Sequence, residues 1–120
     1  MLITFARKEA TPEVNLLIYL PKNTDGPVPA FLTINFFGNH TVHLDPGISI
    51  TRSWLRNNKD WGIENNRADK RSSGSRRSRV VVEITREDGY ALATSYFGDI
   101  DVEYDDGFAN GGNRLYLKPK

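Results

Sequence analysis

Three apolar segments, separated by polar connections, constrain the fold of this chain more than any other feature. They cover residues 14–20, 30–37 and 90–97, and a shorter apolar stretch covers residues 2–6. The second and third segments are nearly continuous in apolar character, which is typical of strands covered on both faces of a parallel sheet. The long connection between them suits a parallel pair joined by a right-handed crossover. The pattern predicts an α/β protein.

Residues 75–88 fit two kinds of element. The branched residues 80–82 favour a strand by intrinsic preference. Arg79 and Glu83 are four positions apart, and Gly89 stands where a helix would end, so the wider frame favours a helix. From Gly98 onward the sequence predicts an acidic, glycine-containing loop.

Residues 38–74 form a long segment without sustained periodicity, and it contains Trp54 and Trp61. Structureless connections longer than roughly 15 residues are uncommon in compact domains and are often binding loops or lids. Two interpretations stay open. The segment is either a lid-like insertion or a long loop pinned by its two tryptophans.

Composition excludes several function classes. The 120 residues make one domain at most, and sixteen basic against fifteen acidic residues leave a formal charge of +1. This balance gives no argument for nucleic acid or for a membrane surface as partner. The absence of cysteine excludes disulfides and thiolate metal sites. No apolar stretch approaches the length of a membrane span, and the first residues lack the layout of a secretion signal.

Two blocks carry a family resemblance. Residues 35–41 read Asn-Phe-Phe-Gly-Asn-His-Thr, and residues 89–101 read Gly-Tyr-Ala-Leu-Ala-Thr-Ser-Tyr-Phe-Gly-Asp-Ile-Asp and continue into residues 105–111. In the identity of their residues, their order and their separation along the chain, the two blocks resemble those of the bacterial glucuronoyl esterases of carbohydrate esterase family fifteen. The chain departs from that family where Val80 replaces an expected tryptophan, where Val102 and Glu103 replace Pro-Asp, and after residue 111.

The resemblance implies a partial α/β-hydrolase fold: a three-layer αβα arrangement with a mostly parallel sheet. Residues 1–120 would be the N-terminal portion of a single, incomplete domain, with residues 75–88 as its first helix. The parent would be a secreted or periplasmic serine hydrolase without cofactor or metal. It would cleave the ester joining glucuronic acid on xylan to a lignin alcohol, and acetylxylan esterase is the nearest alternative. Its partner would be polysaccharide, with neither nucleic acid nor membrane, and the remainder of the hydrolase domain would be missing.

No nucleophile motif occurs in these 120 residues. An α/β hydrolase carries its serine in a Gly-x-Ser-x-Gly turn between a strand and a helix. The nearest approach, at residues 47–51, lacks the second glycine, and no Gly-x-Ser-Arg of the kind implied by the resemblance is present. The chain holds no complete catalytic triad, so we predict that it has no catalytic residue of its own and no turnover alone.

The candidate site residues are Phe37, Gly38, Asn39 and His40, which lie at the end of the predicted strand 30–37 and directly after it. At this position α/β hydrolases place a loop that donates a backbone N–H to the oxyanion. The four residues are therefore candidates for an oxyanion loop or an active-site wall. The alternative is that Asn39 and His40 hydrogen-bond the loop to itself, as polar turn residues do. Asn39 also opens an N-glycosylation triplet.

A metal site is not predicted. His40, His43 and Asp45 match no zinc-ligand spacing. The acidic run 99–106 has Tyr104 where a calcium loop needs glycine and Asn110 where it needs glutamate. We interpret the run as a solvated acidic loop.

The chain has one cluster of basic residues, interrupted by serine and glycine. A solvated loop leading into a helix is the plainest interpretation, with contact to acidic polysaccharide or nucleic acid as alternatives. A second function class is also open, a non-catalytic carbohydrate-binding or interaction module in which Trp54, Trp61 and the tyrosines stack on sugar rings. The cluster comprises Arg67, Lys70, Arg71, Arg76, Arg77 and Arg79.

Overall fold

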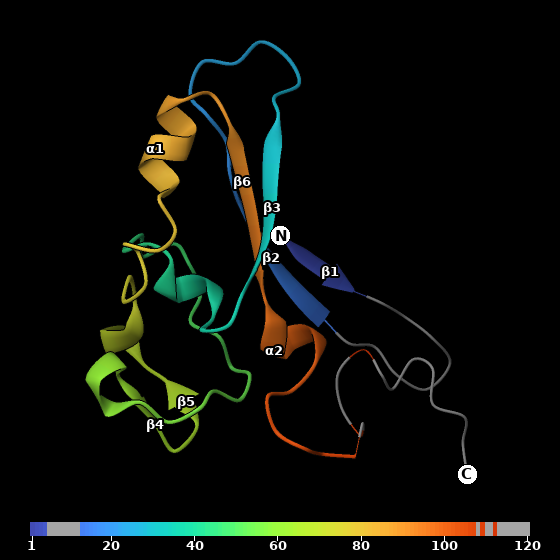
Figure 1. The fold of residues 1–120 in the computed structure, drawn as a ribbon, viewed down its shortest axis with the longest axis vertical. Coiled ribbons are helices and arrows are strands. Elements are labelled where there is room, and N and C mark those ends of the chain that lie inside the picture. Colours follow the sequence, from blue (N-terminus) through green and yellow to red (C-terminus); the bar gives the residue numbers. More distant parts are fainter. Residues whose placement is uncertain (5–12, 108, 110–111, 113–120) are drawn as a thin grey trace.

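The computed structural model describes residues 1–4, 13–107, 109 and 112 (Figure 1). Predicted features at residues 5–6, 110–111 and 113–120 lie outside the described residues. The strands are β1 (Leu2–Thr4), β2 (Glu13–Tyr19), β3 (Ala30–Asn35), β4 (Ile63–Glu64), β5 (Arg67–Ala68) and β6 (Ala91–Tyr96). The helices are α1 (Val82–Glu87) and α2 (Phe97–Ile100), and the 3₁₀ turns are η1 (Asn39–Thr41), η2 (Lys59–Trp61) and η3 (Lys70–Ser72).

A twisted sheet forms the frame, with strand order β1-β2-β6-β3 (Figure 1). β3 and β6 run parallel in a register from Ala30 opposite Ala91 to Asn35 opposite Tyr96, which confirms the predicted parallel pair. β2 pairs antiparallel with both β1 and β6, so the sheet of the described residues is mixed. A mixed sheet with helices is compatible with the predicted fold class, a partial α/β hydrolase, but in the described sheet the β3–β6 pair alone is parallel, whereas a mostly parallel sheet was predicted.

β6 is the central, buried strand, as its apolar character predicts. It lies between β2 and β3, and Ala91, Leu92, Thr94 and Tyr96 are all buried. Its two neighbouring strands use its backbone groups on both sides, and α1 packs against it. β6 therefore holds the end of β3 and the start of α2 in place.

The prediction that strand 30–37 is covered on both faces is wrong for the described residues. Phe31, Leu32 and Ile34 are 54%, 75% and 53% exposed. Because successive side chains of a strand point to opposite faces, both faces of β3 are open. The physical reason is that the described helix α1 packs against β6 and that no described helix is in extensive contact with β3, so the faces of β3 have no covering layer.

The helix interpretation of residues 75–88 is correct in type, but the helix is shorter and begins only at Val82. Arg79 precedes the helix, so the expected pair between Arg79 and Glu83 is not formed, and Glu83 contacts His43 instead. Val82 is buried, and the Arg86 guanidinium donates to the carbonyl of Leu20, which directly follows β2. These two anchors, rather than the propensity of the valines, decide the element.

The segment 38–74 is built from short elements that lie at one end of the sheet (Figure 1). β4 and β5 form a hairpin whose turn residues, Asn65 and Asn66, have φ angles of 51° and 59°. Asparagine tolerates this left-handed backbone, and two-residue hairpin turns require it. Ile63 from β4 joins Leu55 and Tyr96 in a buried apolar cluster, against which Trp61 and Ala68 pack.

The predicted loop from Gly98 begins instead with α2, which continues directly from β6. Gly98 lies so close to the ring of Tyr96 that a Cβ would come within 2.4 Å of it. In the described part of the chain, no helix has the length and apolar character that crossing a bilayer requires.

Candidate functional site

Two segments leave the sheet side by side at the carboxyl ends of β3 and β6. β3 continues into Phe36, Phe37 and Gly38, and β6 continues into Phe97 and α2 (Figure 1). The strands are parallel, so these ends lie at the same edge of the sheet. In α/β sheets ligands bind outside the carboxyl ends of the strands. We take this edge as the candidate site.

Asn35 shapes the loop that follows β3. Its side-chain oxygen accepts a hydrogen bond from the backbone N–H of Gly38 at 2.9 Å and a longer one from Phe37 at 3.4 Å. Its amide nitrogen donates to Asn39 Oδ1 at 2.7 Å and to Thr94 Oγ1 in β6 at 3.1 Å. The last residue of β3 therefore ties the loop to itself and to the central strand.

Gly38 has φ +92°, a backbone conformation that residues with a side chain rarely adopt. A Cβ at this position would lie 2.6 Å from the His40 ring. Asn39 and His40 are buried, with 8% and 1% of their surface exposed. Asn39 donates to the carbonyl of Asn15 in β2 at 2.8 Å. This burial turns the side-chain amide of the glycosylation triplet inward.

His40 is buried without hydrogen-bond partners. Among the described residues, neither of its ring nitrogens has one. Burial lowers the pKa of His40 to about 4, because the imidazolium would lose its hydration. The ring is therefore a neutral packing element beneath the loop. The predicted alternative, in which Asn39 and His40 both bond the loop to itself, fits Asn39 through its bond to Asn35 and does not fit the His40 ring.

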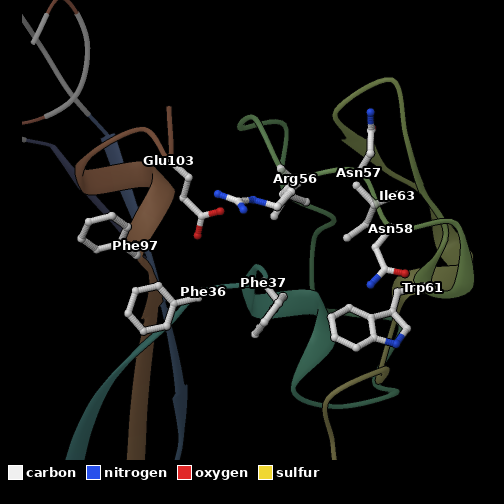
Figure 2. Close-up of a pocket in the computed structure, with 10 residues that line it drawn as sticks. Phe36, Phe37, Arg56, Asn57, Asn58, Trp61, Ile63, Phe97 and Glu103 are labelled. Atoms are coloured by element: carbon white, nitrogen blue, oxygen red, sulfur yellow. The ribbon is translucent and has the colours of Figure 1, made fainter. Parts of the chain in front are cut away.

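A pocket of about 470 Å³ opens beside the loop (Figure 2). Of the four predicted site residues, Phe37 lines it, whereas Gly38, Asn39 and His40 do not. The lining comes from the ends of β3 and β6, from the segment before β4 and from the stretch after α2. It comprises Phe36, Phe37, Leu55, Arg56, Asn57, Asn58, Trp61, Ile63, Phe97 and Glu103.

The aromatic rings of the pocket contact one another in pairs. The Phe36 and Phe97 rings are 5.4 Å apart and join the two strand ends. Phe37 meets Trp61 edge to face at 5.2 Å. The Arg76 guanidinium lies 4.1 Å from the Phe37 ring centre and 4.6 Å from that of Trp61. Such cation–π contacts are worth about 0.5–2 kcal/mol each, so they hold the Phe37–Trp61 wall in place.

The charged groups of the pocket are Arg56 and Glu103, which point toward one another (Figure 2). Burial raises the pKa of Glu103, and the positive charge of Arg56 partly opposes that rise. The pocket therefore carries one charge of each sign, and Glu103 is more buried than Arg56.

Tyr96 anchors the segment behind the pocket. Its hydroxyl donates to the carbonyl of Trp54 at 2.7 Å, and burial raises the pKa of the phenol. Replacing Tyr96 with phenylalanine is expected to lower the free energy of unfolding by about 1–2 kcal/mol, because the Trp54 carbonyl loses its partner. Tyr104→Phe is the matched control: its ring is 44% exposed and contacts the ring of Trp54. Urea melts that show equal losses for both variants would contradict the expectation.

His43 and Asp45 do not form a metal site with His40. His43 Nε2 lies 2.5 Å from Glu83 Oε1 in α1, and its Nδ1 accepts from the backbone N–H of Asp45. Across the described residues, no group of three His, Cys, Asp or Glu side chains is placed to hold a metal ion. His43 instead links the loop after η1 to α1.

The acidic and basic clusters are partly structural. Asp99 accepts hydrogen bonds from the hydroxyl of Ser53 at 2.6 Å and from the backbone N–H of Asn15 at 3.2 Å. This member of the acidic run therefore links α2 to two other segments and is not simply a solvated charge. Arg71 binds Asp69 and Glu64. These exposed pairs contribute little to stability.

Comparison with known proteins gives a consistent picture. No family model matches the chain. The carbohydrate esterase MZ0003, from an unknown prokaryotic organism, is 43% identical over 118 residues, which are 98% of this chain and 27% of that protein. A solved structure described as a promiscuous CE15 esterase from a marine bacterial metagenome is 43% identical, with a TM-score of 0.78. The match covers 96% of this chain and 28% of the chain in that structure.

A second solved structure, a glucuronoyl esterase from Solibacter usitatus, is 35% identical and has a TM-score of 0.82. The match covers 98% of this chain and 29% of the chain in that structure. The chain is homologous to part of a CE15 carbohydrate esterase. It spans little more than a quarter of the length of these relatives.

Sequence reasoning placed Phe37 at the site but missed Phe97, Arg56 and Glu103, and it treated Arg76 as part of a solvated cluster. A signal for Phe97 was present, because it is the last residue of the strand 90–97 that was predicted to pair with β3. No comparable signal marked Arg56, which lies in a segment without periodicity.

Proposed function

We propose that this chain forms part of the active-site wall of a CE15 esterase, and that the whole enzyme hydrolyses the ester between glucuronic acid on xylan and a lignin alcohol. The observation that carries the proposal is the β3–loop–β6 arrangement. The chain that contains it matches a glucuronoyl esterase from Solibacter usitatus over 98% of its length, with a TM-score of 0.82. Under this proposal residues 1–120 are the N-terminal portion of the hydrolase domain. The partner is polysaccharide, and the working compartment is outside the cytoplasm.

The loop after β3 has a defined part in the proposal. The Phe37 ring supplies the wall of the site, supported by its position in the pocket. Gly38 permits the turn, and Asn39 and His40 hold it from beneath, supported by their burial. Asn35 occupies the N–H groups of Phe37 and Gly38, so an oxyanion would draw on N–H groups further along the loop or on residues outside this chain.

The proposed chemistry uses a serine nucleophile, a histidine base and an acid. The serine attacks the ester carbonyl, the alcohol leaves, and water then hydrolyses the acyl-enzyme. No nucleophile motif occurs in the 120 residues, so we place the triad in the part of the relatives that this chain does not span. The exposed edge of β3 is where further strands would add. In the same proposal, residues 38–74 are the insertion that flanks the site.

The chain alone is expected to show no turnover of the methyl ester of glucuronic acid, because it lacks the nucleophile motif. Release of methanol and free acid, followed by chromatography, measures this. Mixing the chain with the complementary part of the carbohydrate esterase MZ0003 is expected to restore hydrolysis. Turnover by the unmixed chain would contradict the expected division of the site, and no turnover by the mixture would contradict the proposed function.

A non-catalytic binding module is the second candidate, and the aromatic-lined pocket favours it. Such a module would melt cooperatively as an isolated chain and would bind its ligand without any partner fragment. Calorimetry of the isolated chain, together with the mixing experiment, separates the two candidates.

A further inference from the structure

We infer that Arg76 is a positioning residue, which fixes the loop after β3 (residues 36–41) against the pocket. Arg76 does not line the pocket itself. Its guanidinium lies over the rings of Phe37 and Trp61, and its backbone N–H donates to the carbonyl of Thr41 at 2.8 Å. One residue therefore contacts the loop near its start and at its end, and it joins the loop to η2 through Trp61.

The other anchors of the loop use its backbone and leave the Phe37 ring to Arg76. Asn35 accepts from backbone N–H groups at the start of the loop. The N–H groups of Gly74 and Arg76 donate to carbonyls in η1 at 2.9 and 2.8 Å. The Phe37 ring packs edge to face on Trp61, with the guanidinium 4.1 Å from its centre. The cation therefore decides where this part of the pocket wall stands.

The charge of Arg76 is directed at the two rings and at no acid. In the described part of the chain no carboxylate forms an ion pair with it, whereas Arg71 in the same basic cluster binds two. Arginine stays protonated in proteins, and the negative faces of aromatic rings offset the charge of a half-buried guanidinium. The next residue, Arg77, is exposed and donates to the carbonyl of Gly74, so it carries the same charge without a ring contact among the described residues.

As a residue that positions the wall of a reacting site, Arg76 rests on the proposed function. As an anchor of the loop in this chain it does not, because the contacts with Phe37, Trp61 and Thr41 need no substrate. The two roles are therefore tested separately.

Amide hydrogen exchange of the 120-residue chain, followed by NMR, tests the anchor. The N–H of Gly38 reports on the loop through its bond to Asn35, and the N–H of Ala91 reports on the sheet through its bond to Pro29. Arg76→Met removes the charge from a side chain of similar length. It is expected to speed exchange at Gly38 about tenfold and at Ala91 less than about twofold. Arg76→Lys keeps a cation without the planar stack, so its exchange rate at Gly38 is expected to fall between those of wild type and Arg76→Met.

Arg77→Met is the matched control, and it is expected to change both exchange rates less than about twofold. Equal factors at Gly38 and Ala91 in Arg76→Met would mean that Arg76 adds only to overall stability, and this result would overturn the inference. An unchanged rate at Gly38, or equal effects of the two methionine variants, would overturn it as well.

The role in the reaction is measured in the mixture with the complementary part of the carbohydrate esterase MZ0003. Arg76→Met is expected to lower kcat about tenfold and to change KM less than about twofold, because a wall held against the ester acts mainly in the transition state. Arg77→Met is expected to keep the wild-type kcat. A loss confined to KM, or equal losses in both variants, would overturn this role. Absence of hydrolysis in every mixture, wild type included, would contradict the proposed function instead, and the exchange rates at Gly38 would then decide the inference.

Discussion

Replacing Leu55 with alanine is expected to lower the free energy of unfolding by about 3–5 kcal/mol. Leu55 is 1% exposed and shares a cluster with Ile63 and Tyr96. The cluster joins the segment before β4 to the central strand, and the described residues bury few other large apolar side chains. Since a domain of this size is stable by about 5–15 kcal/mol in total, the variant is expected to lose a large share of its stability.

Circular dichroism with urea measures this loss. Leu32→Ala is the control, because it removes the same side-chain atoms from a leucine that is 75% exposed in β3. That change is expected to cost less than about 0.5 kcal/mol. Equal losses in the two variants would show that the Leu55 cluster is not the core of the isolated chain.

The strands were predictable because their signal is local. Apolar runs bounded by Pro21 and Gly89 marked β2 and β6, and the distance between β3 and β6 along the chain implied that they are parallel. The boundaries of α1 were less accurate. A helix of six residues is decided by what it packs on, here Val82 and the Arg86–Leu20 bond, rather than by its own propensities.

The exposure of β3 could not be predicted from the chain, because burial depends on what lies next to a strand. Phe31 and Leu32 have the apolar character of an interior strand, yet the described residues leave 54% and 75% of their surfaces exposed. Their exposure agrees with a chain that spans little more than a quarter of its relatives. In the proposed whole enzyme, residues beyond those described supply the cover.

The residues of the candidate site were also predictable only in part. Phe37 and the three residues after it follow a strand directly, so their position was visible in the sequence. Arg56 and Trp61 come to the pocket only because the segment 38–74 folds back over the strand ends, and Glu103 comes to it from the stretch after α2. Arg76 shows the difference most clearly: its neighbours in sequence are basic and polar, but its neighbours in space are two aromatic rings.

His40 is expected to make the chain less stable as the pH falls from about 6.5 to about 4. Burial in the folded state holds the pKa of His40 near 4, whereas a histidine in the unfolded chain has its ordinary pKa of 6.5. Between these values the unfolded chain binds the extra proton, so its free energy falls relative to the folded state. The loss is at most about 3 kcal/mol. The loss of stability is complete below pH 4, the pKa of His40 in the folded state, and absent well above pH 6.5, its pKa in the unfolded chain.

The measurement is the free energy of unfolding from urea melts between pH 4 and pH 7, in wild type and in His40→Leu. Leucine fills a similar space with no ring nitrogen, so this variant is expected to lose less stability at low pH. Every other ionisable group is present in both proteins, so the difference between the two profiles isolates His40. Burial alone lowers the pKa of this ring, with no charged neighbour involved, so added salt is expected to leave the difference unchanged. Parallel profiles would mean that water reaches the ring in solution and that the loop after β3 is more open than its buried residues indicate.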